Sequence, residues 1–181
     1  MSLYIIQITD EMQRAAKHYE DAINKTKTLS RTSNMTGLEE AGRFYFGFLG
    51  ELIFEAALKR ENKEYQHFVR TDGLPQTYKF RVIKDETNQE VRLNICTASK
   101  PSHKFLAVPE PKIHRAECDG YVGIKILENG YAQIFGYITP KELRDCGASA
   151  FPGKSVAAFR CELESLKPIE NLFPKLRAIK K

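Results

Sequence analysis

The chain has 181 residues, of which 42% are hydrophobic and 28% are charged, and this is close to average globular usage. The composition excludes a disordered or fibrous protein, and no apolar run reaches the roughly 18–20 residues needed to cross a bilayer. A chain of this length buries roughly two-thirds of the surface that its unfolded form exposes, so we expect a single domain over residues 1–181. The first residues lack a basic segment followed by an apolar one, which predicts a cytoplasmic protein.

The formal net charge of +5 comes from 28 Lys and Arg against 23 Asp and Glu. This modest excess is compatible with a polyanionic partner and does not by itself indicate one. The four cysteines form no Cys-x-x-Cys pair, and the four histidines have no zinc-ligand spacing. We therefore expect reduced thiols and no structural zinc site.

Two helices are expected in the first third of the chain. Thr9 can cap a helix over residues 10–27, and Thr36-Gly37-Leu38-Glu39 has the form of a capping box that opens a helix over residues 36–60. The second helix is apolar around most of its circumference, so it should lie centrally in the fold, with Phe48 and Leu52 buried.

After these helices the sequence predicts mainly strands. Runs rich in β-branched and aromatic residues predict strands over residues 66–71, 77–84, 90–98, 103–108, 119–127, 131–138 and 155–163. Asn129-Gly130 favours a tight hairpin turn, Thr139-Pro140-Lys141-Glu142 predicts another helix start, and residues 169–175 suggest a short last helix. This order predicts an α+β fold, with a mixed central sheet flanked by helices.

The strand over residues 90–98 carries the most informative pattern. Alternate side chains share a face of a strand, so Glu90, Arg92, Asn94 and Cys96 point the same way while the apolar residues between them point into a core. An edge strand with a solvated polar face and the remnant of an active-site strand both fit this pattern. No phosphate-binding loop, dinucleotide fingerprint, hydrolase elbow or HExxH zinc motif is present.

Several short segments stand in order between Phe48 and Leu143. They are Gly50-Glu51, Tyr78-Lys79-Phe80, Asn94-Ile95-Cys96-Thr97-Ala98-Ser99, Asp119-Gly120-Tyr121-Val122, and Gly136-Tyr137-Ile138-Thr139 with Glu142-Leu143. In this order and spacing the chain resembles the PD-(D/E)XK, restriction-endonuclease-like nucleases, especially small prokaryotic members. The resemblance covers about half of the chain, and it implies a restriction-endonuclease-like fold.

The resemblance also implies a chemistry. In such nucleases an aspartate and a glutamate hold a divalent cation, usually Mg²⁺, while a lysine orients or activates water. Here Lys79 stands at the aspartate position, Asn94 at the glutamate position and Cys96 at the lysine position. Of the expected residues only Glu51 remains, the helix glutamate that some members use as a further metal ligand. A degenerate active site of this kind predicts no bound cofactor and no phosphodiester cleavage.

Two alternatives stay open at this point. An offset Glu-x-Arg site would use Glu90 and Arg92 with Glu51 and an aspartate, Asp72 or Asp85, and would make the protein an active Mg²⁺-dependent DNA endonuclease. Arginine is a poor replacement for a water-activating lysine, because it stays protonated. The second alternative, a cysteine nucleophile at Cys96, would need a histidine within hydrogen-bond reach.

A basic loop follows the strand over residues 90–98. Lys100, His103 and Lys104 lie in it, beside the predicted cleft, where such a fold would meet phosphates. A solvated loop without a partner is the other interpretation. The resemblance thus predicts a nucleic-acid-associated protein, with DNA as the expected partner, no membrane association, and a homodimer as a compatible assembly.

Overall fold

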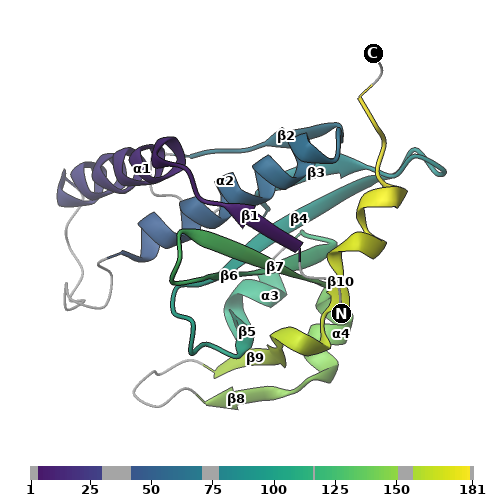
Figure 1. The fold of residues 1–181 in the computed structure, drawn as a ribbon. Helices are drawn as coiled ribbons and strands as arrows, with labels where there is room; N and C mark the ends of the chain where they lie inside the picture. Colours follow the sequence, from purple (N-terminus) through teal and green to yellow (C-terminus); the bar gives the residue numbers. More distant parts are fainter. Residues whose placement is uncertain (1–3, 30–41, 71–77, 116, 151–156, 180–181) are drawn as a thin grey trace.

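The computed structural model describes residues 4–29, 42–70, 78–115, 117–150 and 157–179. Helices α1 and α2 lie together on one side of a central sheet, and a smaller sheet lies on the other side (Figure 1). The helices are α1 Asp10–Leu29, α2 Arg43–Arg60, α3 Glu110–Arg115 and α4 Pro140–Asp145. The strands are β1 Tyr4–Gln7, β2 Tyr65–His67, β3 Phe80–Ile83, β4 Glu90–Ala98, β5 Phe105–Pro109, β6 Gly120–Ile126, β7 Tyr131–Ile138, β8 Ala148–Ala150, β9 Ala157–Glu162 and β10 Lys167–Pro168.

The first long helix confirms its sequence prediction, whereas the helix predicted over residues 36–60 begins only at Arg43. The hydroxyl oxygen of Thr9 accepts a hydrogen bond from the backbone N–H of Met12 at 3.2 Å and so caps α1 as expected. Helix α2 begins at Arg43, after Gly42 with a φ of 81°, and the predicted capping box at 36–39 lies outside the described residues. The backbone N–H of Gly42 donates to the carboxylate of Glu20 at 3.0 Å, so α1 supports the start of α2.

The central sheet has the strand order β1-β7-β6-β4-β3-β2, with β10 also pairing with β7. Among these pairs only β4 and β6 are parallel, and the others are antiparallel. The chain passes from β4 to β6 through β5 and α3, which supplies the crossover that parallel neighbours need. The sheet is therefore mixed, as the sequence predicted.

The second face of the central sheet is covered differently from the prediction. A three-stranded antiparallel sheet with the order β5-β9-β8 lies there, together with the short helices α3 and α4. The α+β class is confirmed, whereas long helices cover only the α1–α2 face among the described elements. The last predicted helix, over residues 169–175, is instead a pair of short 3-10 turns, Ile169–Asn171 and Phe173–Lys175.

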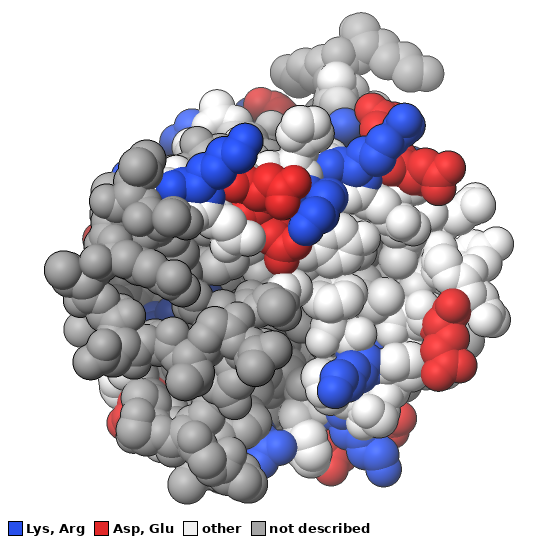
Figure 2. Space-filling view, turned by 90° about the vertical axis from the view of Figure 1, so that its left-hand side faces the viewer, with Lys and Arg blue, Asp and Glu red and all other residues white. Residues whose placement is uncertain are grey.

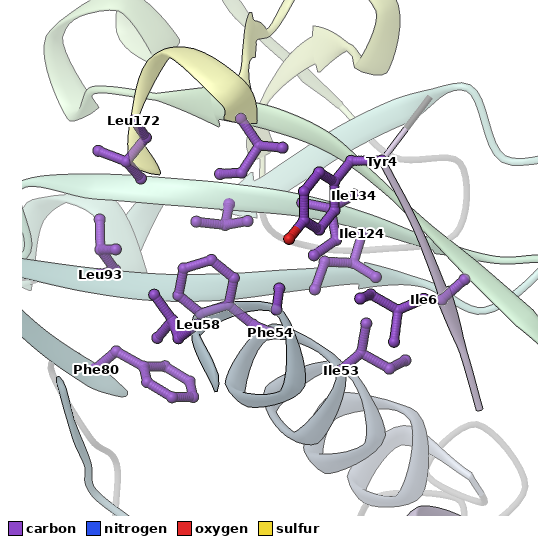
Figure 3. Packing of buried hydrophobic residues seen from close by; sticks show 14 of the residues in the cluster. Tyr4, Ile6, Ile53, Phe54, Leu58, Phe80, Leu93, Ile124, Ile134 and Leu172 are labelled. Carbon is purple, nitrogen blue, oxygen red and sulfur yellow. The ribbon is translucent and has the colours of Figure 1, made fainter. Parts of the chain in front are cut away.

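The larger core lies between α2 and the central sheet (Figure 3). Phe54 is fully buried there, with its ring edge-on to Phe80 at 5.1 Å and stacked on Phe173 at 6.4 Å between ring centroids. The C-terminal turns therefore pack into the same core as α2 and β3. Phe48 is buried as predicted, but Leu52 is only partly buried, because an apolar helix surface does not reveal which side meets the sheet.

The smaller core lies between the central sheet and the three-stranded sheet. Helix α4 closes it with the fully buried Leu143. The predicted capping box is formed here: the hydroxyl of Thr139 accepts from the backbone N–H of Glu142 at 3.3 Å, and the carboxylate of Glu142 accepts from the backbone N–H of Thr139 at 3.1 Å. Lys167 adds an ion pair to the same carboxylate.

Two glycines of α2 should respond in opposite ways to alanine. A Cβ at Gly47 would meet nothing within 4 Å, whereas a Cβ at Gly50 would lie 1.9 Å from the Thr97 hydroxyl oxygen and 3.1 Å from its Cβ. We expect Gly47→Ala to raise the free energy of unfolding by about 0.5–1 kcal/mol through the better helix propensity of alanine. Gly50→Ala should lower it by about 1–3 kcal/mol through overpacking. Urea unfolding measures both, and equal effects would show that α2 does not approach β4 at Gly50.

The acid sensitivity of α4 should depend on Glu142. Its ion pair with Lys167 and its hydrogen bonds with Thr139 lower the pKa of Glu142 to about 2. A carboxyl with a lowered folded pKa stabilises the fold above its unfolded pKa of about 4.3, and this contribution is lost as the pH falls. We expect thermal unfolding to show a shallower loss of stability between those two pKa values for Glu142→Gln than for the wild type. The same dependence of stability on pH in Glu142→Gln and the wild type would contradict the ion pair.

Candidate functional site

The buried carboxylate of Glu51 is the centre of the candidate site. Glu51 lies on α2 with only 5% of its surface exposed. The ammonium group of Lys79 donates to its Oε1 at 3.0 Å, and Nε2 of His67 lies 3.0 Å from its Oε2. Both carboxylate oxygens are therefore occupied by nitrogen groups from the β2–β3 edge of the sheet.

Lys79 reaches Glu51 because of a local irregularity in the strand ladder. It lies in the bend just before β3, where its backbone N–H donates to the carbonyl of Leu93 at 2.9 Å. Leu93 is also the residue opposite Phe80 in the β3–β4 register. Two consecutive residues of the chain thus meet the same residue of β4, and the long side chain of Lys79 extends to α2 beside the buried ring of Phe80.

His67 joins Glu51 to a second carboxylate one helical turn away. Its Nδ1 lies 3.1 Å from Oε2 of Glu55, so the ring bridges the two glutamates. Each ring nitrogen of His67 therefore faces a carboxylate oxygen. The ring of His67 also stacks on Phe80 at 4.3 Å and on Phe48 at 6.0 Å between centroids. The imidazole is therefore held by two carboxylates at its edges and by aromatic rings on its faces.

Glu55 is stabilised in its ionised form by several donors. Burial by itself would raise its pKa, but hydrogen bonds from Lys59, Tyr65 and His67 outweigh burial, so the pKa of Glu55 lies below its usual range. The hydroxyl of Tyr65 donates to Oε1 at 2.9 Å and the ammonium of Lys59 lies 2.8 Å from the same oxygen. Burial, followed by this hydrogen bond, raises the pKa of Tyr65.

Asn94 and Cys96 do not share this site. Thr97 packs against Gly50 of α2, and Leu93 and Ile95 belong to the core on the α2 side of the sheet. By strand alternation the side chains of Asn94 and Cys96 point to the opposite side. Their partners in the parallel register, Tyr121 and Gly123, face the smaller core as well. The structure brings Glu51 and Lys79 together and places the other two motif positions across the sheet.

Cys96 lies in a poor environment for a nucleophile. Burial raises the pKa of its thiol to about 11, and the charge of Lys112 offsets this only in part. A thiol with a raised pKa is scarcely ionised near neutral pH and reacts slowly. The thiol of Cys96 is partly buried against the smaller core, and this environment favours a structural role over the nucleophile that the sequence left open.

The residues of the offset site are engaged in surface pairs. Glu90 lies opposite Ile83 at the start of β4, three residues from the Phe80–Leu93 pair, and its carboxylate accepts from Arg81 at 3.1 Å. Arg92 points to the face away from α2, and its guanidinium lies 3.6 Å from the carboxylate of Glu117. Asp85 is exposed at the β3–β4 turn, and Asp72 lies outside the described residues. Glu90 and Arg92 are not brought to Glu51.

The basic loop after β4 is exposed. Lys100, His103 and Lys104 all present open side chains, and no ion pair joins any of them to another residue in the described ranges. The loop is held at both ends: the backbone N–H of His103 donates to the carbonyl of Lys100 at 3.0 Å, and the carbonyl of Lys104 accepts from Leu163 at 2.8 Å. Three groups suited to phosphate therefore lie on an anchored turn.

The residues around Glu51 do not fit a Mg²⁺ site. A hard cation needs oxygen ligands, and Glu51 already accepts from the Lys79 ammonium, which would repel a metal ion. Within the described ranges, no group of three or more His, Cys, Asp or Glu side chains is arranged to hold a metal. The carboxylate of Glu51 is thus paired with the Lys79 ammonium and the His67 ring from the β2–β3 edge.

Comparison with known proteins adds no relative. No family model, curated protein or solved structure matches this chain. Within the described residues, no helix combines the length and the apolar character needed to cross a membrane.

The sequence did not single out Glu55, Tyr65 or His67. One signal for the helix part was present, because Glu51, Glu55 and Lys59 follow one another at intervals of four residues in an otherwise apolar helix. This spacing places three charged side chains on one face and indicates a polar contact. Nothing in the sequence indicates that β2 supplies the partner.

The Lys79–Glu51 pair should be strongly coupled. Lys79→Met leaves a buried carboxylate with one donor fewer, and we expect it to lower the free energy of unfolding by roughly 1–3 kcal/mol. The exposed Lys59 is a control, since Lys59→Met should cost less than about 1 kcal/mol. In a double-mutant cycle with Glu51→Gln, urea unfolding should give a combined loss well below the sum of the single losses. Additive losses would mean that the two side chains do not interact.

Proposed function

We propose that this chain is a nuclease-fold protein that binds nucleic acid, DNA in the first instance, and does not cleave it. The observation that carries the proposal is the ion pair at 3.0 Å between Lys79 and Glu51. At the position where the resemblance implies a metal-binding aspartate, an ammonium group occupies the one carboxylate that the pattern retains. A bound Mg²⁺ would supply positive charge to a phosphodiester reaction, and here the ammonium group of Lys79 takes its place.

The arrangement of the strands supports the nuclease-like part of the proposal. The strand segments that carry the resemblance lie at the start of β3, in the second half of β4, at the start of β6 and at the end of β7. These four strands are successive neighbours in the central sheet. The Gly-Glu step lies on α2, directly against β4 through Gly50 and Thr97. Pieces that are separate in the sequence are thus adjacent in space, as a common fold pattern requires.

The nucleic-acid part of the proposal depends on the anchored basic loop. Lys100, His103 and Lys104 are exposed and can reach phosphate oxygens, and contacts of this kind give affinity without sequence preference. On the face shown in Figure 2, lysines and arginines alternate with acidic side chains and form no single basic area among the described residues. We therefore expect weak, salt-sensitive binding by a protein that acts in the cytoplasm, as a monomer or a homodimer.

DNA binding should depend on the loop lysines. We expect the Lys100→Ala, Lys104→Ala double variant to weaken binding to duplex DNA at every sequence. The slope of log affinity against log salt should fall by about two, because roughly one counterion is released per phosphate contact. Fluorescence anisotropy with a labelled oligonucleotide measures this.

The matched control removes the same charge at the far end of β4. Lys84 lies at the β3–β4 turn, and Lys175 lies beside it at the end of the last 3-10 turn, where its carbonyl accepts from the backbone N–H of Asp85 at 2.9 Å. The Lys84→Ala, Lys175→Ala variant should keep the salt slope. Equal loss of DNA affinity in both variants would indicate that binding depends on net charge alone. Unchanged affinity in both would show that the loop does not contact DNA. Cleavage of DNA by the wild type with Mg²⁺, abolished by Glu90→Ala, would establish the offset endonuclease instead.

A further inference from the structure

Two cysteines that are distant from the candidate site lie side by side at the end of the smaller sheet. Strands β8 and β9 pair antiparallel with Ala148 opposite Phe159. The backbone N–H of Arg160 donates to the carbonyl of Gly147 at 3.4 Å, which extends the same register by one pair. The next position brings Cys146, the residue that ends α4, opposite Cys161 of β9.

The two thiols are close enough to influence one another, because Cys146 is, after burial, the main cause of the raised pKa of Cys161. Cys146 ends α4 with a helical backbone and Gly147 follows with a φ of 85°, so Cys146 lies just before the paired strand, next to the Gly147–Arg160 hydrogen bond. A disulfide would need the Cα atoms of Cys146 and Cys161 about 4.4–6.8 Å apart, a separation that neighbours of a cross-strand bond can reach. Cys161 is buried while Cys146 is exposed, which gives the pair one accessible member.

We propose that Cys146 and Cys161 form an oxidation site, at which a small peroxide converts the two thiols into an intramolecular disulfide. In the first step the sulfur of Cys146 attacks one peroxide oxygen and breaks the O–O bond, which yields a sulfenic acid and releases the other oxygen in water. In the second step the sulfur of Cys161 attacks the sulfur of Cys146 and displaces the hydroxyl group as a second water, with the Cys161 proton. The two thiols lose two electrons, and hydrogen peroxide gains them.

The environment assigns the two roles. Burial, followed by the hydrogen bond with Cys146 and the nearby carboxylates of Glu162 and Glu142, raises the pKa of the Cys161 thiol to about 12. A buried, protonated thiol meets oxidants slowly, so the exposed Cys146 reacts first and Cys161 resolves it. The disulfide would join the end of α4 to β9 and make a closed loop of the chain between the two cysteines. This loop restricts the unfolded state and so raises the melting temperature.

The test uses the full reduced chain and hydrogen peroxide. We expect the intact mass to fall by the two hydrogens lost, and non-reducing tryptic digestion to join the peptides 145–154 and 161–175, which each contain one cysteine of the pair. Thermal unfolding should show a melting temperature several degrees higher than that of the reduced protein, with reversal by dithiothreitol.

Variants separate this pair from the other two cysteines. Cys146→Ser and Cys161→Ser should each abolish the mass loss, whereas Cys96→Ser and Cys118→Ser should leave it intact. Because Cys161 is buried and its variant could unfold, the exposed Cys146→Ser serves as the decisive variant. Addition of oxygen without a cross-link, a bond that involves Cys96 or Cys118, or a disulfide-linked dimer would each overturn the proposal.

Discussion

The burial of Glu51 is the constraint on which the site depends. Moving a carboxylate out of water costs several kcal/mol unless donors replace the solvent. Here Lys79 and His67 supply these donors from the β2–β3 edge, and each lies 3.0 Å from a carboxylate oxygen. The bend at Lys79 makes this contact possible, because a regular strand would direct that side chain away from the helix.

The elements that could be predicted from the sequence have local signals. Strands β4 and β7 have the predicted bounds, because alternation and flanking turns mark them, and the capping box of α4 is read directly from Thr139 and Glu142. The short elements β1, β8 and α3 carry too few residues for a period to show. The site is harder, since alternation places Asn94 and Cys96 on one face but does not indicate that α2 covers the other. The bridge from His67 to α2 depends on tertiary packing alone.

Part of the nuclease-like pattern has a packing explanation of its own. Gly50 lets α2 approach Thr97, and a Cβ at Gly136 would lie 2.0 Å from the carbonyl oxygen of Lys167, which pairs with β7 through β10. These two glycines are needed for the close approach of neighbouring elements, independently of the residues at the polar motif positions.

Divalent-metal binding tests the central claim most directly. Lys79 neutralises Glu51, and the neighbouring carboxylate of Glu55 is engaged by His67, Tyr65 and Lys59. Among the described residues no group of three or more His, Cys, Asp or Glu side chains is arranged to hold a metal ion. Calorimetric titration of the wild-type protein with Mn²⁺ should show no saturable site up to millimolar metal, and Glu51→Ala should give the same trace. A saturable site that disappears in Glu51→Ala would contradict the account, because it would show that the metal displaces Lys79 from the carboxylate.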